Sequence, residues 1–405
     1  MKVLCLVLLC FITLILAEEN KPFRIEMERM ETGLEKLLRR GADLKLIEGI
    51  YDMQRRAAKP RKLLMENGKP IPTNDTLPLF KYFDTQYYGL VNIGKPGKTF
   101  KMVMDTAWAY TWVPSVECPL VSIACARHER YDHSRSSTYK PDGTSFNISN
   151  TYVGYLSNDL FLVGQMNTTD QKFAELKHLP WINALYEADG TLGLGLEKLS
   201  PGVTPLFYNF YRQNKIAPIF SFYINRDPTT KRGGSIFFGG IDYKHNKTAF
   251  TTLDVTSDFY WEFQVDKIAL VMSKKSQKEY CKNGCKALAD TSANTIIGPA
   301  DEINDINRLI GATEIFFSNR YMIPCINELK GPKVKFTIAN QEFMILARDY
   351  IQKVSYSGIT ICLSAFQPGE HSTGPDQWVL GGAFLYQYYT AYDVVRRKIL
   401  IAEAA

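Results

Sequence analysis

Two short segments, one in each half of the chain, repeat the same pattern. Residues 102–107 read Met-Val-Met-Asp-Thr-Ala and residues 288–292 read Leu-Ala-Asp-Thr-Ser, so each apolar run ends in Asp-Thr and a small residue. The two aspartates, Asp105 and Asp290, lie 185 positions apart in a chain of 405 residues. One Asp-Thr at the end of a strand is usually only a turn cap, whereas the repeat predicts two related halves that each present an aspartate.

A second element repeats at a matching distance. Leu192-Gly193 ends 88 residues after Asp105, and Leu380-Gly381 ends 91 residues after Asp290. If the two aspartate loops meet, both carboxyl groups cannot ionise easily, so one holds a proton while the other stays charged. Such a pair supplies an acid and a base, which is what the water-mediated hydrolysis of a peptide bond needs.

The length and the strand pattern predict a mostly β protein with two lobes. A chain of 405 residues exceeds one ordinary core, and 45% hydrophobic residues suffice for a packed interior. Residues 87–94 and 99–104 alternate or run apolar on either side of a Gly-Lys-Pro-Gly turn, which is typical of paired strands. Short helices are predicted at 204–214 and 300–311.

The first 75 residues differ from the rest. An apolar run from Val3 to Ala17 is short for a membrane span and is followed by acidic residues, so we predict a signal peptide at 1–17. Residues 18–75 are rich in charge, show helical apolar spacing and end in a proline-containing linker. They are predicted to be a propeptide, with an ordinary N-terminal helical subdomain as the alternative. No later apolar stretch is long enough to span a bilayer in the mature form.

The charge distribution argues against nucleic acid as a partner. The net charge is +6, but much of the basic excess precedes residue 65, and removing that region leaves a body close to neutral. The body contains no basic stripe interleaved with aromatic residues, which nucleic-acid binding would favour.

The cysteines indicate disulfide bonds. Beyond the signal peptide the chain has Cys118, Cys125, Cys281, Cys285, Cys325 and Cys362. An even number in a secretory chain implies disulfides, and the clustering suggests the pairs 118–125, 281–285 and 325–362. A zinc site is the competing interpretation, but His128 and His133 lack a second cysteine pair at finger spacing. We therefore expect no metal.

Four sequons agree with a secretory route, although single sequons are often unused. They are at Asn74, Asn147, Asn167 and Asn246.

Further segments resemble the pepsin-type aspartic protease family, closest in pattern to its lysosomal members. The matching segments are residues 87–89, 112–115, 136–139, 154–157, 239–242, 321–325 and 402–405, in addition to the two aspartate loops. The resemblance covers nearly everything after the signal peptide. It implies a bilobal fold with a cleft between two lobes that are related by a pseudo-twofold axis. We place the N-terminal lobe at 76–265 and the C-terminal lobe at 266–405.

The resemblance also implies roles for single residues. Asp105 and Asp290 would face each other at the floor of the cleft and activate water, without a metal or an organic cofactor. Thr106 and Thr291 would cross-link the two loops by hydrogen bonds. A β-hairpin flap of the N-terminal lobe would close over a protein or peptide substrate, and the propeptide would block the cleft until acid releases it. We expect a monomer that is lysosomal or extracellular and digestive.

Departures from the family are concentrated at these loops. Ala107 and Ser292 replace a glycine but keep its N–H, which supports the site. Trp108 and Ala293 occupy the next position and lack the hydroxyl that orients each aspartate in the family. Losing a hydrogen bond to a charged acceptor typically costs about 1.5–3 kcal/mol. That energy corresponds to roughly tenfold to a hundredfold in rate.

The predicted flap, at residues 146–153, is about three residues shorter than in the family and has no glycine. Tyr152 is the candidate for the flap tyrosine although its position does not align, and Trp112, the partner of that tyrosine in the family, is retained. A short hairpin should exclude water and hold substrate less well. The sequence therefore predicts a slow aspartic endopeptidase. The alternative is a non-catalytic homologue that binds peptide or protein in the retained cleft.

Overall fold

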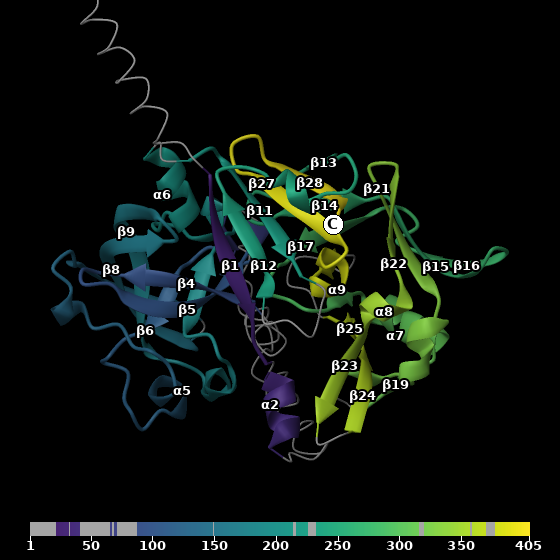
Figure 1. Ribbon diagram of the computed structural model, residues 1–405, viewed down its shortest axis with the longest axis horizontal. Helices are drawn as coiled ribbons and strands as arrows, with labels where there is room; N and C mark the ends of the chain where they lie inside the picture. The colour runs from purple at the N-terminus through teal and green to yellow at the C-terminus, as the bar shows by residue number, and fades with distance from the viewer. Residues whose placement is uncertain are drawn as a thin grey trace, which may run out of the picture.

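The computed structural model describes residues 22–31, 33–40, 65–66, 69–70, 87–148, 150–213, 216–225, 232–315, 320–356, 359–369 and 377–405. The predicted signal peptide, much of the predicted propeptide and the sequon at Asn74 lie outside these residues. The described chain is mostly β and folds into two lobes joined by a shared central sheet (Figure 1). The predicted bilobal β fold is confirmed.

The largest sheet has thirteen strands in the order β13-β28-β27-β11-β12-β1-β4-β5-β10-β6-β9-β8-β7. Its strands are β1 (Phe23–Arg29), β4 (Tyr87–Ile93), β5 (Lys98–Asp105), β6 (Trp112–Pro114), β7 (Lys140–Ile148), β8 (Tyr152–Val163), β9 (Met166–His178), β10 (Gly190–Gly193), β11 (Ile219–Ile224), β12 (Arg232–Phe238), β13 (Thr251–Asp254), β27 (Tyr388–Asp393) and β28 (Lys398–Glu403). The C-terminal strands β27 and β28 thus pair with β11 and β13, which lie in the segment predicted to be the N-terminal lobe, and this pairing ties the two lobes together.

The second lobe is built on smaller sheets. A five-stranded sheet contains β14 (Glu262–Val265), β17 (Cys285–Ala289), β26 (Gln377–Leu380), β18 (Ile296–Gly298) and β25 (Phe366–Pro368). One four-stranded sheet contains β16 (Ser276–Tyr280), β15 (Lys267–Ser273), β21 (Lys333–Ile338) and β22 (Gln341–Ile345). The other contains β19 (Thr313–Glu314), β20 (Tyr321–Met322), β24 (Ile359–Ser364) and β23 (Ile351–Tyr356). Strands β2 (Met65–Glu66) and β3 (Lys69–Pro70) form a separate pair.

The helices are short. The α-helices are α2 (Gly33–Arg39), α5 (Ile123–Ala126), α6 (Leu206–Arg212), α7 (Ala300–Ile310), α8 (Ala347–Tyr350) and α9 (Gly382–Leu385). The 3-10 helices are η1 (His133–Arg135), η2 (Trp181–Leu185), η3 (Glu197–Leu199), η4 (Tyr243–His245) and η5 (Cys325–Leu329). The predictions at 204–214 and 300–311 are confirmed by α6 and α7. No helix of the described residues is long and apolar enough to cross a membrane.

Part of the predicted propeptide is built into the central sheet. Strand β1 lies between β12 and β4, and its burial alternates, with Phe23, Ile25 and Met27 inside. This period of two is what a strand with one solvated face requires. The helix α2 follows, and Lys36 on it forms an ion pair of 3.3 Å with Glu187.

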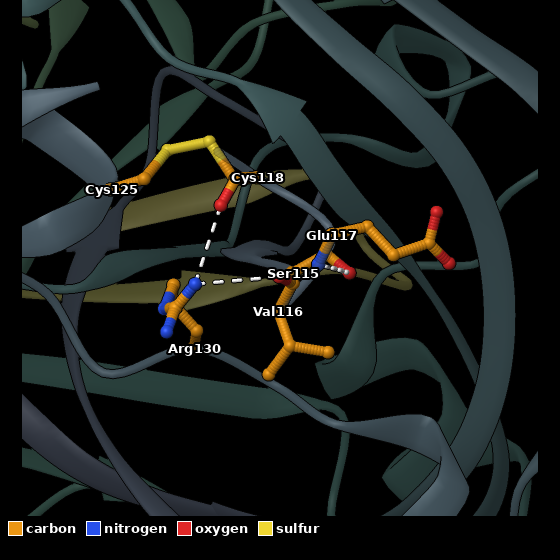
Figure 2. The surroundings of a disulfide bond; sticks show 6 residues. All are labelled: Ser115, Val116, Glu117, Cys118, Cys125 and Arg130. Atoms are coloured by element: carbon orange, nitrogen blue, oxygen red, sulfur yellow. Dashed lines mark hydrogen bonds between the residues drawn. A yellow bond between two sulfur atoms is a disulfide. The ribbon is translucent and has the colours of Figure 1, made fainter. Parts of the chain in front are cut away.

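All three predicted disulfides are present. They join Cys118 to Cys125, Cys281 to Cys285 and Cys325 to Cys362, with Cα–Cα distances of 6.0, 5.5 and 5.2 Å. Figure 2 shows the first of them, where the Arg130 guanidinium donates to the carbonyl oxygens of Val116 and Cys118, each at 3.3 Å. The disulfide and the arginine together fix the chain that follows β6.

Candidate active site

Each aspartate lies at the end of a strand that has a parallel Leu-Gly partner. Strand β5 ends at Asp105 and pairs with β10, which sets Gly193 opposite Asp105. Strand β17 ends just before Asp290 and pairs with β26, whose Leu380 carbonyl accepts from the Asp290 N–H at 3.1 Å. The repeat that the sequence spacing predicted is therefore a pair of similar strand arrangements, one in each lobe.

Glycine is needed in both Leu-Gly elements because backbone passes directly against them. A Cβ on Gly193 would lie 2.3 Å from the carbonyl group of Ala109. A Cβ on Gly381 would lie 2.4 Å from the carbonyl oxygen of Thr295. Both distances are too short for any side chain, so these glycines let each aspartate loop rest on its neighbouring strand.

The two loops are cross-linked by their threonines. The Thr106 N–H donates to Thr291 Oγ1 at 3.2 Å, and the Thr291 N–H donates to Thr106 Oγ1 at 3.0 Å. The Thr106 hydroxyl also donates to the carbonyl of Ala289 at 2.8 Å, and the Thr291 hydroxyl donates to that of Met104 at 2.7 Å. These carbonyls immediately precede the two aspartates. The network therefore brings both carboxyl groups to one junction between the lobes.

Both carboxyl groups are buried and oriented from their own loops. Asp105 is 2% exposed and Asp290 0% exposed. The Ala107 N–H donates to Asp105 Oδ1 at 2.8 Å. Asp290 Oδ1 accepts from the N–H of Ser292 at 3.0 Å and from that of Ala293 at 3.3 Å. Ala107 and Ser292 thus keep the backbone donors expected of a glycine at these positions.

A further donor to Asp290 was not predicted from the sequence. The Ser292 hydroxyl donates to Asp290 Oδ1 at 2.8 Å. It supplies an orienting hydroxyl one position earlier than the family does, on the loop where Ala293 has none. The sequence did contain a hint of this donor. Of the two residues that replace a family glycine, Ala107 and Ser292, only the serine has a hydroxyl.

Tyr152 packs against two tryptophans of the first aspartate loop and its neighbour, although its position does not align with the flap tyrosine of the family. It begins β8, pairs with Ile148 across the hairpin turn and is 1% exposed. Its ring centroid is 5.3 Å from that of Trp112 and 6.4 Å from that of Trp108. Burial raises the pKa of its hydroxyl, and the charge of Asp105 acts in the same direction. The β7–β8 hairpin therefore places a buried tyrosine against the aromatic residues that follow Asp105.

This pair of buried aspartates on cross-linked strand ends matches a known family. The family model for eukaryotic aspartyl proteases matches residues 86–404. The chain belongs to this family. The resemblance stated from the sequence is therefore confirmed.

Curated relatives of this aspartyl protease agree. The chain is 36% identical to cathepsin D of Homo sapiens over 357 residues, which cover 83% of this chain and 85% of the relative. It is 37% identical to cathepsin D of Rattus norvegicus over 341 residues, covering 81% and 82%. Cathepsin D of Chionodraco hamatus is 36% identical over 341 residues, covering 82% and 84%.

The described sequons of this aspartyl protease differ in exposure. Asn147 and Asn167 are exposed, and Asn246 is half-buried. The Asn147 amide donates to Asn150 Oδ1, and its oxygen accepts from the Asn150 N–H, both at 2.9 Å, so this side chain helps to form the hairpin turn. The Asn246 amide donates to the Thr248 carbonyl at 3.0 Å. Glycosylation at these positions stays a prediction.

The chemistry of the site rests on carboxyl groups. Within the described part of the chain, no group of three or more His, Cys, Asp or Glu side chains has an arrangement that could hold a metal ion. What the junction does offer is two buried carboxyl groups held by backbone donors and, at Asp290, by a hydroxyl donor.

Proposed function

We propose that this aspartyl protease is an endopeptidase that hydrolyses peptide bonds of proteins and peptides at acidic pH, with Asp105 and Asp290 as the catalytic residues. The observation that carries the proposal is the reciprocal hydrogen bonding between Thr106 and Thr291, because it holds the two aspartate loops against each other. The matched strand pairs beneath both loops and the family membership support it.

The proposed reaction uses one proton shared by the pair. Two buried carboxyl groups at one site favour a state in which one is protonated and the other ionised. The ionised carboxylate takes a proton from water as the water oxygen attacks the peptide carbonyl carbon, and the protonated carboxyl donates its proton to the carbonyl oxygen. As the tetrahedral intermediate collapses, the C–N bond breaks, the gem-diol gives back a proton and the leaving amine receives one. The pair ends with the single proton it began with.

We expect the carboxyl group of Asp105 to be held less firmly in its orientation than that of Asp290. Ser292 adds a hydroxyl donor on the Asp290 loop, whereas neither Ala107 nor Trp108 has a hydroxyl to give Asp105. A hydrogen bond to a charged group is worth about 1.5–3 kcal/mol. Its absence would slow the reaction by roughly tenfold to a hundredfold if it is felt fully in the transition state. We therefore propose a slow enzyme.

We also propose that the chain is made as a zymogen in the secretory pathway. The predicted signal peptide would direct it there, and the three disulfides fit an oxidising compartment. Residues 18–75 would form the propeptide, of which β1 and α2 are docked on the body of the protein. The mature enzyme would act in a lysosome or outside the cell.

Acid activation of the full chain tests the proposal. The secreted protein is brought to pH 3–5 and incubated with reduced, unstructured casein, with and without a peptide that contains the transition-state mimic statine. We expect slow cleavage that the statine peptide blocks and that Asp105→Asn and Asp290→Asn each abolish. The lost hydroxyls at Trp108 and Ala293 favour a second candidate, a non-catalytic peptide-binding homologue. Tight binding of the statine peptide without any casein cleavage would establish that candidate instead.

A further inference from the structure

The indole of Trp108 is a buried donor at the position where the family has a hydroxyl. Its side chain is 3% exposed, and its Nε1 has no hydrogen-bond acceptor among the described residues. Burying an N–H without an acceptor is unfavourable, and native proteins contain few such groups, so each one requires a reason.

The backbone of Trp108 is fixed while its side chain meets the hairpin. The Trp108 carbonyl accepts from the Gly195 N–H at 2.9 Å, which anchors the residue on the strand-end element beneath the aspartate loop. Its ring centroid lies 6.2 Å from that of Tyr110 and 6.4 Å from that of Tyr152. The indole therefore belongs to the buried cluster through which the loop of Asp105 contacts the β7–β8 hairpin.

We propose that the Trp108 indole N–H binds a backbone carbonyl oxygen of an extended peptide once the β7–β8 hairpin lifts from the Asp105 loop. An extended peptide carries a carbonyl oxygen at every residue, so it offers the acceptor that this donor lacks. The N–H has no acceptor among the described residues, and the peptide carbonyl would supply one on binding. Trp108 thereby becomes a substrate-contacting residue rather than one that orients Asp105. The inference rests on the proposed function, which makes a peptide the ligand, but it does not require that the peptide be cleaved.

The chain contains a matched control. Trp378 on β26 is 1% exposed, and its Nε1 likewise has no acceptor among the described residues. Its ring packs against Gly298 of the neighbouring strand β18, inside the core of the second lobe. The two tryptophans share burial and an unsatisfied donor, and they differ in that only Trp108 contacts the hairpin aromatics.

Binding of a fluorescent statine-containing hexapeptide to the full, acid-treated protein tests the inference. Fluorescence anisotropy gives the Kd for the wild type, Trp108→Phe and Trp378→Phe. Phenylalanine keeps an aromatic ring but removes the N–H. We expect Trp108→Phe to weaken binding roughly 3- to 10-fold, the range for one neutral hydrogen bond, and Trp378→Phe to leave it unchanged. Thermal unfolding of Trp108→Phe and Trp378→Phe is measured alongside, because each substitution leaves a smaller ring at a buried site and should lower stability. A loss of affinity confined to Trp108→Phe then assigns the binding effect to that residue rather than to the loss of stability.

Peptide analogues identify the acceptor. In a series of hexapeptides, each amide in turn is replaced by a trans-alkene, which removes one carbonyl oxygen and one N–H without adding charge. One analogue should lose more affinity for the wild type than for Trp108→Phe, because only the wild type also loses the hydrogen bond to the indole. If every analogue loses the same factor with both proteins, the inference is overturned.

A spectroscopic measurement covers a Trp108→Phe variant that does not fold. The wild type has five tryptophans, so its NMR spectrum contains five indole N–H signals. Phenylalanine variants of the other four tryptophans assign these signals. The hexapeptide should move the Trp108 signal downfield and leave the Trp378 signal in place. A stationary Trp108 signal, equal binding by Trp108→Phe, or no binding by the wild type each overturns the inference. Failure to cleave casein overturns only the proposed catalysis, because every measurement here is of binding.

Discussion

The Ser292 hydroxyl donates a 2.8 Å hydrogen bond to Asp290 Oδ1, the same oxygen that accepts from the Ser292 N–H. A residue that replaces a glycine thus gives Asp290 two donors rather than one. Donors aimed at one carboxylate oxygen fix the plane of the group. The serine therefore offsets the hydroxyl that is missing at Ala293.

Removing this hydroxyl should slow catalysis. We expect Ser292→Ala to lower kcat/KM for a cleaved peptide by roughly tenfold to a hundredfold, because a hydrogen bond to a charged acceptor is lost. Ser292→Gly should do the same, and Ser292→Gly combined with Ala293→Thr should recover the loss by moving the hydroxyl to the next position. Steady-state kinetics at one acidic pH measures all three. An unchanged rate in Ser292→Ala would show that the backbone donors alone orient Asp290.

The features predicted from the sequence are those that depend on local or repeated patterns. Repeat spacing predicts the two aspartate loops and their Leu-Gly partners. Apolar periodicity predicts the helices near 204–214 and 300–311, and cysteine clustering predicts the three disulfides. Ser292 shows the limit of this reasoning. At its position the sequence indicates only that a side chain replaces a glycine, whereas the direction of its hydroxyl depends on the turn of the loop around Asp290.

Tertiary packing determines what the sequence does not show at the hairpin and the N-terminus. The family motif leaves Tyr152 out of position, yet the shorter turn carries its ring onto Trp112, because the ring packs into a buried cluster with Trp108 and Phe146. Residues 23–29 form strand β1, although other parts of the same segment have helical apolar spacing. The stretch is short, alternates in polarity and pairs with the edges of β12 and β4. Such edges are invisible in a single sequence.

The threonine cross-link should stabilise the protein as one unit. We expect Thr106→Val or Thr291→Val to lower the free energy of unfolding by about 1–3 kcal/mol, because each leaves buried partners without a hydrogen bond. The two variants remove different hydrogen bonds, but both sets hold the same two loops together. The double variant should therefore cost less than the sum, since loops that one substitution has already loosened have less left to lose. Urea denaturation of the four proteins gives this cycle, with Thr→Ser at each position as the control that keeps the hydroxyl. Simple additivity would mean that the two loops are held independently.

Gly154 should be indispensable to the hairpin. A Cβ at this position would lie 1.9 Å from the carbonyl oxygen of Glu175 on β9, a distance that forces the strands apart. We expect Gly154→Ala to lower the midpoint of thermal unfolding and to weaken peptide binding, since overpacking typically costs about 1–3 kcal/mol and the shift displaces Tyr152. Gly240→Ala is the control, because a Cβ there would be 3.4 Å from its nearest neighbour, Phe237. Equal effects of the two substitutions would contradict the geometric argument.

The Asp142–Lys172 ion pair should hold the hairpin to β9 at the acidic pH where the enzyme is proposed to work. The pair spans 2.8 Å between β7 and β9. The hydrogen bond from Lys172, aided by Thr144, lowers the pKa of Asp142 from 3.8 to about 2. The unfolded chain therefore takes up this proton more readily than the folded protein. The stabilisation is complete above pH 3.8 and disappears as the pH falls to about 2.

Comparing Asp142→Asn with the wild type between pH 6 and pH 2 measures this contribution. We expect the variant to unfold at a lower temperature by a constant amount above about pH 4. The two melting curves should then converge as the pH falls toward 2, because the wild-type carboxylate becomes protonated. Asp170→Asn is the control, since the ion pair of Asp170 with Lys140 is more than half exposed on both sides and should contribute little at any pH. A difference between Asp142→Asn and the wild type that persists at pH 2 would place the stabilisation in packing rather than in the charge of Asp142.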